Sequence, residues 1–216
     1  MRSVVVFASL GLLSGVLCYF AVGYVDLEPL HFSLFPFGQR QTAAPILPGI
    51  IFGVLVAAAC RHYGSRRLPL LVLAIAFTTA AWILAFDVTI KADSMIGELR
   101  KTSDTIAAAS QSGGAYAEAP GERWRNLVPQ LALGGTISFG LGGLVGGFGT
   151  ALAVAAANAR FRDARSWLLT LAVATFFGAI ERVYDLMGDI GLLVLFAAWQ
   201  AAVIATIAHG LGKRQT

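Results

Sequence analysis

Six long runs of apolar residues divide this chain, and each is close to the length that a helix needs to cross a bilayer. A hydrocarbon core of about 30 Å requires about 20 apolar residues in helical form. We therefore predict an all-α, polytopic transmembrane helical bundle with about six spans, forming one integral membrane domain over residues 1–216. The predicted spans are residues 4–25, 44–60, 68–90, 128–157, 167–184 and 190–208.

Composition supports a chain surrounded mostly by lipid. Hydrophobic residues make up 57% of it and charged residues 13%, whereas soluble domains are about 25% charged. The first apolar run follows Arg2 and is also compatible with a cleaved secretory signal. It is longer than the apolar region of about 7–15 residues that such signals carry, so we expect a retained helix.

The basic residues are clustered at alternate ends of the predicted spans. With six crossings and a cytoplasmic N-terminus, one side of the membrane holds nine Lys or Arg and a single acid, Asp163. Because positive residues are retained in the cytoplasm, both termini are predicted to lie inside. The net charge of +4 does not indicate nucleic acid, since the cations form no continuous stripe. The 13 Arg, 3 Lys and abundant Ala and Gly favour a bacterial inner membrane.

A glycine-rich stretch, GGTISFGLGGLVGGFGT, occupies residues 134–150. It contains neither the glycine spacing of a dinucleotide-binding turn nor the Gly-Lys pair of a phosphate loop. Small residues instead recur every four positions, which lets helix backbones approach closely in lipid. The stretch therefore predicts a helix-packing face against a neighbour in the same chain or in a second copy; a pore lining or a hinge is the functional alternative. The predicted packing residues are Gly134, Ser138, Gly142, Gly143, Gly146 and Gly147.

A weak internal repeat relates the second and third spans to the fourth and fifth. Residues 48–87 align without a gap on residues 146–185, with thirteen identities in forty pairs at a shift of 98 positions. The implied unit is a helical hairpin used twice, related by an axis along the membrane normal. Residues 91–127 form the one sizeable extramembrane segment, into which we expect the third helix to continue before a flexible linker near residues 111–123.

Charged residues close to the predicted spans are the main candidates for a binding site, because burying a charge in a membrane is costly. We consider a cluster near the outer face that holds an ion or passes a proton. An interfacial salt-bridge group that pins two helices is the simpler explanation. Mid-membrane positions offer only hydroxyl and amide groups, each expected to form a helix–helix hydrogen bond: Thr78, Thr79, Ser138, Thr175 and Gln200. The cluster consists of Asp87, Glu181, Arg182 and Asp185.

The sequence indicates no catalytic residue and no metal ligand set, and it leaves any cofactor open. We expect a non-catalytic packing or assembly subunit of a larger membrane complex, whose partners are the lipid bilayer and other membrane chains or a second copy. A small ion or solute channel or permease formed by homo-oligomerisation is the alternative, and an intramembrane enzyme is a third. The substrate, partner chains and oligomeric state do not follow from the residues alone.

Overall fold

The computed structural model describes residues 2–24, 46–111, 120–180 and 188–213, and within them every regular element is a helix. Its elements are α1 (Arg2–Tyr24), α2 (Ile46–His62), α3 (Leu68–Gln111), α4 (Pro120–Ala157), the 3-10 helix η1 (Ala159–Phe161), α5 (Ala164–Ala179) and α7 (Gly188–Gly212). The all-α prediction is confirmed. Four segments are long and apolar enough to cross a membrane: Arg2–Ala21, Leu68–Leu99, Gly134–Ala157 and Leu193–Gly212.

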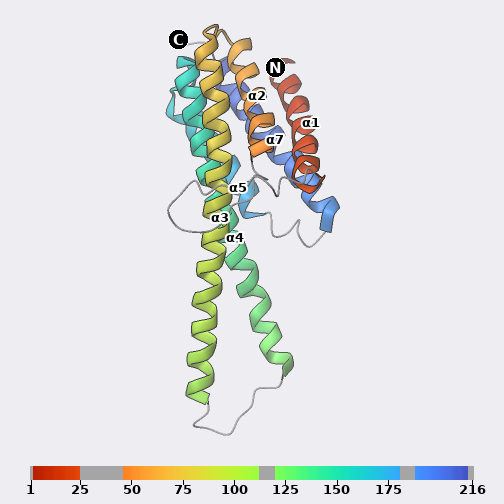
Figure 1. Ribbon diagram of the computed structural model, residues 1–216, viewed down its shortest axis with the longest axis vertical. Coiled ribbons are helices and arrows are strands. Elements are labelled where there is room, and N and C mark those ends of the chain that lie inside the picture. The colour runs from red at the N-terminus through yellow and green to blue at the C-terminus, as the bar shows by residue number, and fades with distance from the viewer. Residues whose placement is uncertain (1, 25–45, 112–119, 181–187, 214–216) are drawn as a thin grey trace.

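The helices pack as a closed ring, with each one lying against its neighbours in the order α1, α2, α3, α4, α5, α7 and back to α1. Both ends of the described chain lie at the same end of this ring, whereas α3 and α4 continue far beyond the other helices in the opposite direction (Figure 1). Large apolar side chains cover the outside of the ring, among them Val5, Leu13, Val72, Phe148 and Leu168. A water-soluble monomer rarely exposes so much apolar surface, so the fold and surface are those of an α-helical membrane protein.

The helix bounds show the secondary structure of the segment predicted to lie outside the membrane. Most of residues 91–127 is helical, because α3 continues to Gln111 and α4 already begins at Pro120. The expected continuation of the third helix is thus present, and residues 112–119, in the predicted linker, lie outside the described part of the chain. α2 and α5, at 17 and 16 residues, are shorter than a full membrane span.

Two short turns tie the hairpins together at the end of the ring where the termini lie. α2 ends in a Schellman motif: Gly64 has a φ of 104°, and the Ser65 amide donates to the Cys60 carbonyl at 2.9 Å. The Ser65 hydroxyl then donates to the carbonyl of Ala157 at the end of α4 at 2.8 Å. In return, the side-chain amide of Asn158 donates to the Cys60 carbonyl at 3.4 Å. Each turn therefore supplies a side-chain donor to a carbonyl group at the end of the other helix.

The glycine stretch lies in the second half of α4 and packs on two helices of the same chain. Toward α3, a Cβ atom placed on Gly142 would lie 2.0 Å from the Thr89 hydroxyl, and one on Gly146 would lie 3.2 Å from the Ala85 methyl. Gly134 approaches Ile96 of α3 in the same way, and Ser138, in the same four-residue row, is fully buried. This row is occupied by α3, so it is not open to a second copy.

The neighbouring row of glycines faces α5. A Cβ on Gly143 would lie 2.3 Å from the carbonyl oxygen of Ala174, and one on Gly147 would lie 2.6 Å from the Ala174 methyl. The contact is reciprocal, because a Cβ on Gly178 of α5 would lie 2.3 Å from the Phe139 oxygen of α4. The two backbones therefore touch at this crossing, and no side chain fits between them.

We predict that Gly143→Ala destabilises the bundle by about 1–3 kcal/mol or more, because the added methyl meets backbone atoms of α5 that cannot rotate away. Gly140→Ala is the matched control on the same helix, since its Cβ would lie 3.5 Å from the Ala179 methyl, an ordinary contact. Denaturant or thermal unfolding of the purified protein in detergent measures both. Equal stability of the two variants would contradict the close backbone contact.

Candidate functional site

Only one member of the predicted charged cluster, Asp87, lies in the described part of the chain. Its carboxylate forms an ion pair with Lys91 at 2.6 Å, one turn further along α3, and its side chain is 11% exposed. Sequence reasoning did not include Lys91 in the cluster, although the i, i+4 spacing of opposite charges on one helix is the signal for such a pair. Glu181, Arg182 and Asp185 lie outside the described residues.

The position of this ion pair along α3 corresponds to the edge of the hydrocarbon core of a bilayer. Asp87 follows Leu68 by 19 residues, which at 1.5 Å per residue is about 29 Å and equals the thickness of the hydrocarbon core. An ion pair at that level reaches the polar headgroup region. The one described member of the cluster, Asp87, therefore has the geometry of an interfacial ion pair with Lys91.

A different group of polar atoms gathers at the middle of the bundle. Six side chains have buried nitrogen or oxygen atoms with no hydrogen-bond partner in the described part of the protein. Counted along their helices from the end with the termini, all six lie about 15–21 Å deep, close to the middle of a 30 Å core. They are Ser14 of α1, Thr78 and Trp82 of α3, Thr175 of α5, and Trp199 and Gln200 of α7.

Gln200 is the most demanding member of this mid-level polar group. Its side chain is fully buried, and its amide has no hydrogen-bond partner among the described residues other than a weak interaction with the Cys18 thiol. The Cys18 thiol lies beside it on α1 together with Ser14. α1 and α7 approach very closely here, since a Cβ on Gly15 would lie 2.4 Å from the Ala197 Cα. Close packing thus brings three small polar groups to one point between these helices.

An aromatic cluster adjoins Gln200. The rings of Trp82 and Trp199 have centroids 4.9 Å apart, and Phe52 and Phe196 stack against them at 6.2 and 6.1 Å. Both indole N–H groups lack an acceptor. The mid-level polar group therefore offers hydrogen-bond donors and acceptors beside aromatic faces, and the described helix segments at this depth carry no charged residue. This chemistry suits water or a neutral polar ligand.

The sequence analysis identified part of this group. Thr78, Thr175 and Gln200 belong to the mid-level polar group, whereas Thr79 and Ser138 bond to carbonyls one turn back on their own helices, at 2.9 and 3.0 Å. The expected helix–helix hydrogen bonds are thus replaced by bonds within one helix for Thr79 and Ser138, whereas Gln200 of α7 interacts with the Cys18 thiol of α1. Ser14, Trp82 and Trp199 were not anticipated. Comparing how far each polar or indole side chain lies from the end of its helix, rather than looking for charges, could have identified them.

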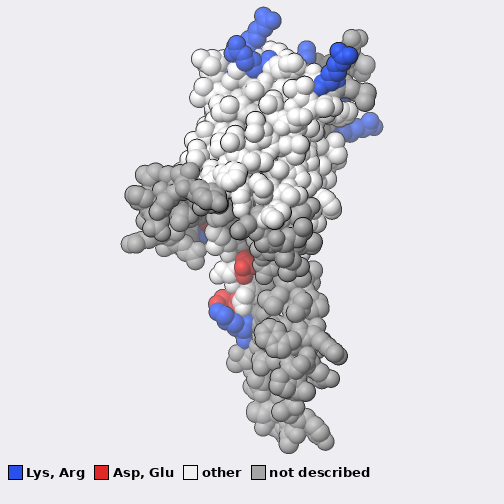
Figure 2. Space-filling view, turned by 90° about the vertical axis from the view of Figure 1, so that its right-hand side faces the viewer, with Lys and Arg blue, Asp and Glu red and all other residues white. Residues whose placement is uncertain are grey.

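The end of the ring that carries the termini is strongly basic. Eight Lys or Arg lie there among the described residues: Arg2, Arg61, Arg66, Arg67, Arg160, Arg162, Arg165 and Lys213. Figure 2 shows cations at this end and an uncharged band next to it. Asp163 is the one acid that the described residues place there, and it caps α5 by accepting from the Ser166 amide at 3.0 Å.

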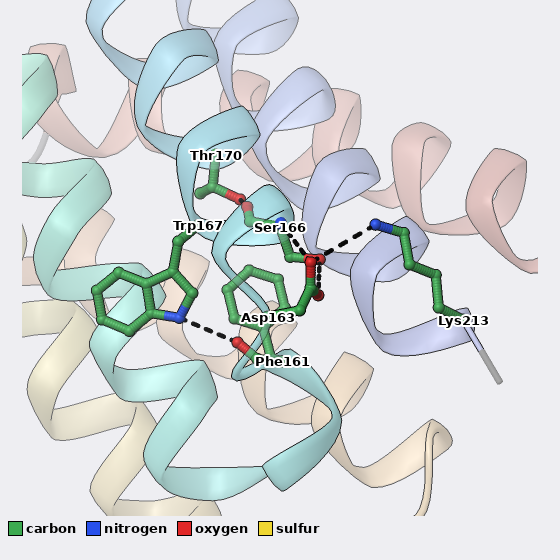
Figure 3. Close-up of polar contacts among 6 residues, drawn as sticks. All are labelled: Phe161, Asp163, Ser166, Trp167, Thr170 and Lys213. Carbon is green, nitrogen blue, oxygen red and sulfur yellow. Dashed lines mark hydrogen bonds and ion pairs between the residues drawn. The ribbon is translucent and has the colours of Figure 1, made fainter. Parts of the chain in front are cut away.

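Asp163 also links this cap to α7. The Ser166 hydroxyl donates to its carboxylate, and the Lys213 ammonium lies 3.8 Å from it (Figure 3). These interactions lower the pKa of Asp163 below its usual value, with the Ser166 hydroxyl as the largest cause. Nearby, the Trp167 indole donates to the Phe161 carbonyl at 3.0 Å and fixes the turn before α5. The basic end is therefore a hydrogen-bonded and ordered surface.

No protein-family model matches this chain, and neither a curated protein nor a solved structure is significantly similar to it. Among the described residues, no three His, Cys, Asp or Glu side chains come together in a way that could hold a metal ion. The functional argument therefore depends on the geometry of the chain itself.

We predict that Gln200→Met raises the free energy of unfolding by about 1–3 kcal/mol, because a buried amide with only a weak partner is replaced by an apolar side chain of similar length. Thr170→Val is the control: the Thr170 hydroxyl is equally buried but donates to the Ser166 carbonyl at 2.9 Å, so its loss lowers stability by about 0.5–1.5 kcal/mol. Unfolding in detergent separates the two. A loss for Gln200→Met as large as that for Thr170→Val would show that the amide is satisfied.

We also expect Asp163→Ala to lower stability at neutral pH by up to about 1 kcal/mol, the usual loss for a helix cap. Because the folded pKa of Asp163 is lowered, its stabilising effect is present above the unfolded value of about 3.8 and is lost as pH falls through the folded pKa. The difference in stability between wild type and variant is therefore largest at neutral pH and shrinks as the pH is lowered into the acid range, which unfolding curves across that range measure. A difference that persists in acid would assign the effect to packing.

Proposed function

We propose that this chain is a non-catalytic subunit of a larger membrane complex, which anchors a helical arm to the bilayer and docks another protein on that arm. The supporting observation is the extension of α3 and α4 beyond the ring (Figure 1). From Asp87 at the membrane boundary to Gln111, α3 covers 24 residues, or about 36 Å of helix outside the hydrocarbon core.

The arm carries an apolar stripe of two exposed side chains, Met95 and Leu99, beside the face that packs on α4. Ile96 points to α4, since a Cβ on Gly134 would lie 2.9 Å from its methyl group. Met95 and Leu99, one turn apart, are 67% and 70% exposed. If the hydrocarbon core ends near Asp87, within the longer apolar segment Leu68–Leu99, these side chains contact water rather than lipid, and apolar residues in that position are a usual mark of a protein interface. A partner with a complementary apolar groove would bury them.

Charge placement supports an orientation in which the basic end lies in the cytoplasm. Both termini and the eight described cations share that end, which is the distribution that retains a loop on the cytoplasmic side. The arm then projects from the opposite face. In a bacterial inner membrane, which the residue composition favours, the partner would be a periplasmic protein or the outer part of a membrane chain.

Contacts between equivalent positions support the duplicated hairpin. Cys60 and Asn158 are related by the 98-residue shift, and a hydrogen bond joins them. Gly49 and Gly147, another equivalent pair, each face the second helix of their own hairpin, through Thr79 of α3 and Ala174 of α5. A duplicated hairpin accounts for the first contact, but the two hairpins are not arranged symmetrically, because α3 packs along α4 whereas the equivalent pair, α5 and α2, scarcely touch.

The mid-level polar group favours a second candidate function, a small permease for a neutral polar solute. Transport sites lie near the membrane midplane, where this group is found. Because α3 and α5 cover the glycine rows of α4, such a path would run through a single copy rather than along a glycine interface between copies. Solute uptake into proteoliposomes that is lost in Gln200→Met but retained in Thr170→Val would favour this function over the first.

We predict that the double substitution Met95→Ser, Leu99→Ser lowers the amount of partner that co-purifies with the tagged chain at least tenfold. Burial of two such side chains is worth more than 1.4 kcal/mol, the equivalent of a factor of ten in affinity. Quantitative mass spectrometry of the complex after mild detergent extraction measures the loss.

Ser94→Ala with Glu98→Gln is the matched control, since both residues are exposed on the same turns of the arm and leave the apolar stripe intact. It should retain the partner. If the chain co-purifies with no stoichiometric partner, or if both double variants retain it equally, the docking role of the arm is wrong.

A further inference from the structure

A cavity of about 270 Å³ opens at the basic end, between the first turn of α1, the turn after α2 and the end of α7. Its polar lining comes from Ser3, Tyr63, His209 and Lys213, and its apolar lining includes Val4 and Ala208. The three chain segments that form it are far apart in the sequence but meet where the ring closes between α1 and α7. The volume is near the lower end of the range for small-ligand sites.

The lining favours a negatively charged group. Lys213 supplies a cation, and Ser3 and Tyr63 supply hydroxyl donors. Ser3 lies in the first turn of α1, where backbone N–H groups point out of the helix and attract anions. His62 extends the polar surface, with its Nε2 atom 3.3 Å from the Ser3 hydroxyl oxygen. Among the described residues that line the cavity, none carries a carboxylate, and Asp163 lies 3.8 Å from the Lys213 ammonium.

The level of the cavity shows what kind of anion fits. Its lining residues lie in the first turn of α1 and near the end of α7, at the ends of the apolar segments Arg2–Ala21 and Leu193–Gly212 that are long enough to cross a membrane. Where such helices leave the hydrocarbon core, they meet the phosphate groups of the lipid headgroups. Val4 and Ala208 add apolar wall beside the polar groups, which suits the apolar part of a lipid next to its phosphate.

We propose that this cavity binds the phosphate headgroup of an anionic phospholipid from the leaflet at the basic end. Basic pockets between membrane helices on the cytoplasmic side commonly hold such headgroups. The bound lipid would fill the gap between α1 and α7 and add a contact to the junction that closes the ring. The inference depends on the chain spanning a membrane and is independent of the partner subunit proposed above.

Native mass spectrometry of the purified protein, titrated with phosphatidylglycerol or phosphatidylcholine in detergent, tests this assignment. We expect phosphatidylglycerol to bind in preference to phosphatidylcholine. Lys213→Gln should weaken the binding of phosphatidylglycerol about fivefold, since one cation at a membrane surface is worth about 1 kcal/mol to an anionic lipid. Lys213→Arg, which keeps the charge, should restore it.

Arg67→Gln is the control for the general field of the basic end, because Arg67 lies at the start of α3 and does not line the cavity. It should bind phosphatidylglycerol nearly as well as the wild type. Equal binding of the two lipids, or equal weakening by Lys213→Gln and Arg67→Gln, would overturn the proposal. Displacement of the lipid by millimolar inorganic phosphate would also overturn it, and would identify the cavity as a site for free phosphate.

Discussion

Close contact between helix backbones is the interaction on which this bundle depends. Two apolar helices gain little from burying their side chains against each other in lipid, so association relies on packing that brings main-chain atoms together. Gly143 and Gly178 allow it where α4 crosses α5, and Gly15 allows it where α1 crosses α7. Without the crossing of α1 and α7, the ring would be open between these two helices, because no short loop joins them.

These crossings also fix the position of the mid-level polar group. The short distance between α1 and α7 at Gly15 holds Gln200 next to Ser14 and Cys18. A fully buried amide with only a weak partner opposes folding, because its hydrogen bonds to water are lost and not fully replaced. Packing at glycine therefore offsets a polar cost that the sequence retains at the centre of the bundle. Transport proteins bind their substrates at this depth. The free-energy cost of burying polar groups there is the reason that a permease is the second candidate function.

Much of the fold could be predicted from local pattern. The apolar runs located all six α-helices in the described chain, and the four-residue spacing of small residues identified the face of α4 that packs on its neighbours. Spacing could not show that α3 and α5 occupy that face, because the pairing of helices is a property of the whole ring. The start of α4 was predicted too late, at residue 128 instead of Pro120, for a different reason: hydropathy falls where a helix leaves the membrane, but its backbone hydrogen bonds continue.

The candidate sites were harder to predict. Charge directed attention to Asp87, whose ion pair with Lys91 lies at the membrane boundary. The indole groups of Trp82 and Trp199 lie in apolar surroundings along the sequence, and their unpaired N–H groups become apparent only when neighbouring helices are in place. The cavity near Lys213 combines three distant segments, so no single stretch of sequence could indicate it.

α3 runs without interruption from the basic end to the tip of the arm, and its one proline after Leu68 is in the first turn. A continuous helix of 44 residues behaves as a stiff rod about 66 Å long. A change of about 10° in its tilt, as occurs when a helix adapts to a thinner bilayer, would shift the far tip sideways by roughly 6 Å relative to the membrane boundary. Bilayer thickness and the position of anything held at the tip are thereby mechanically linked.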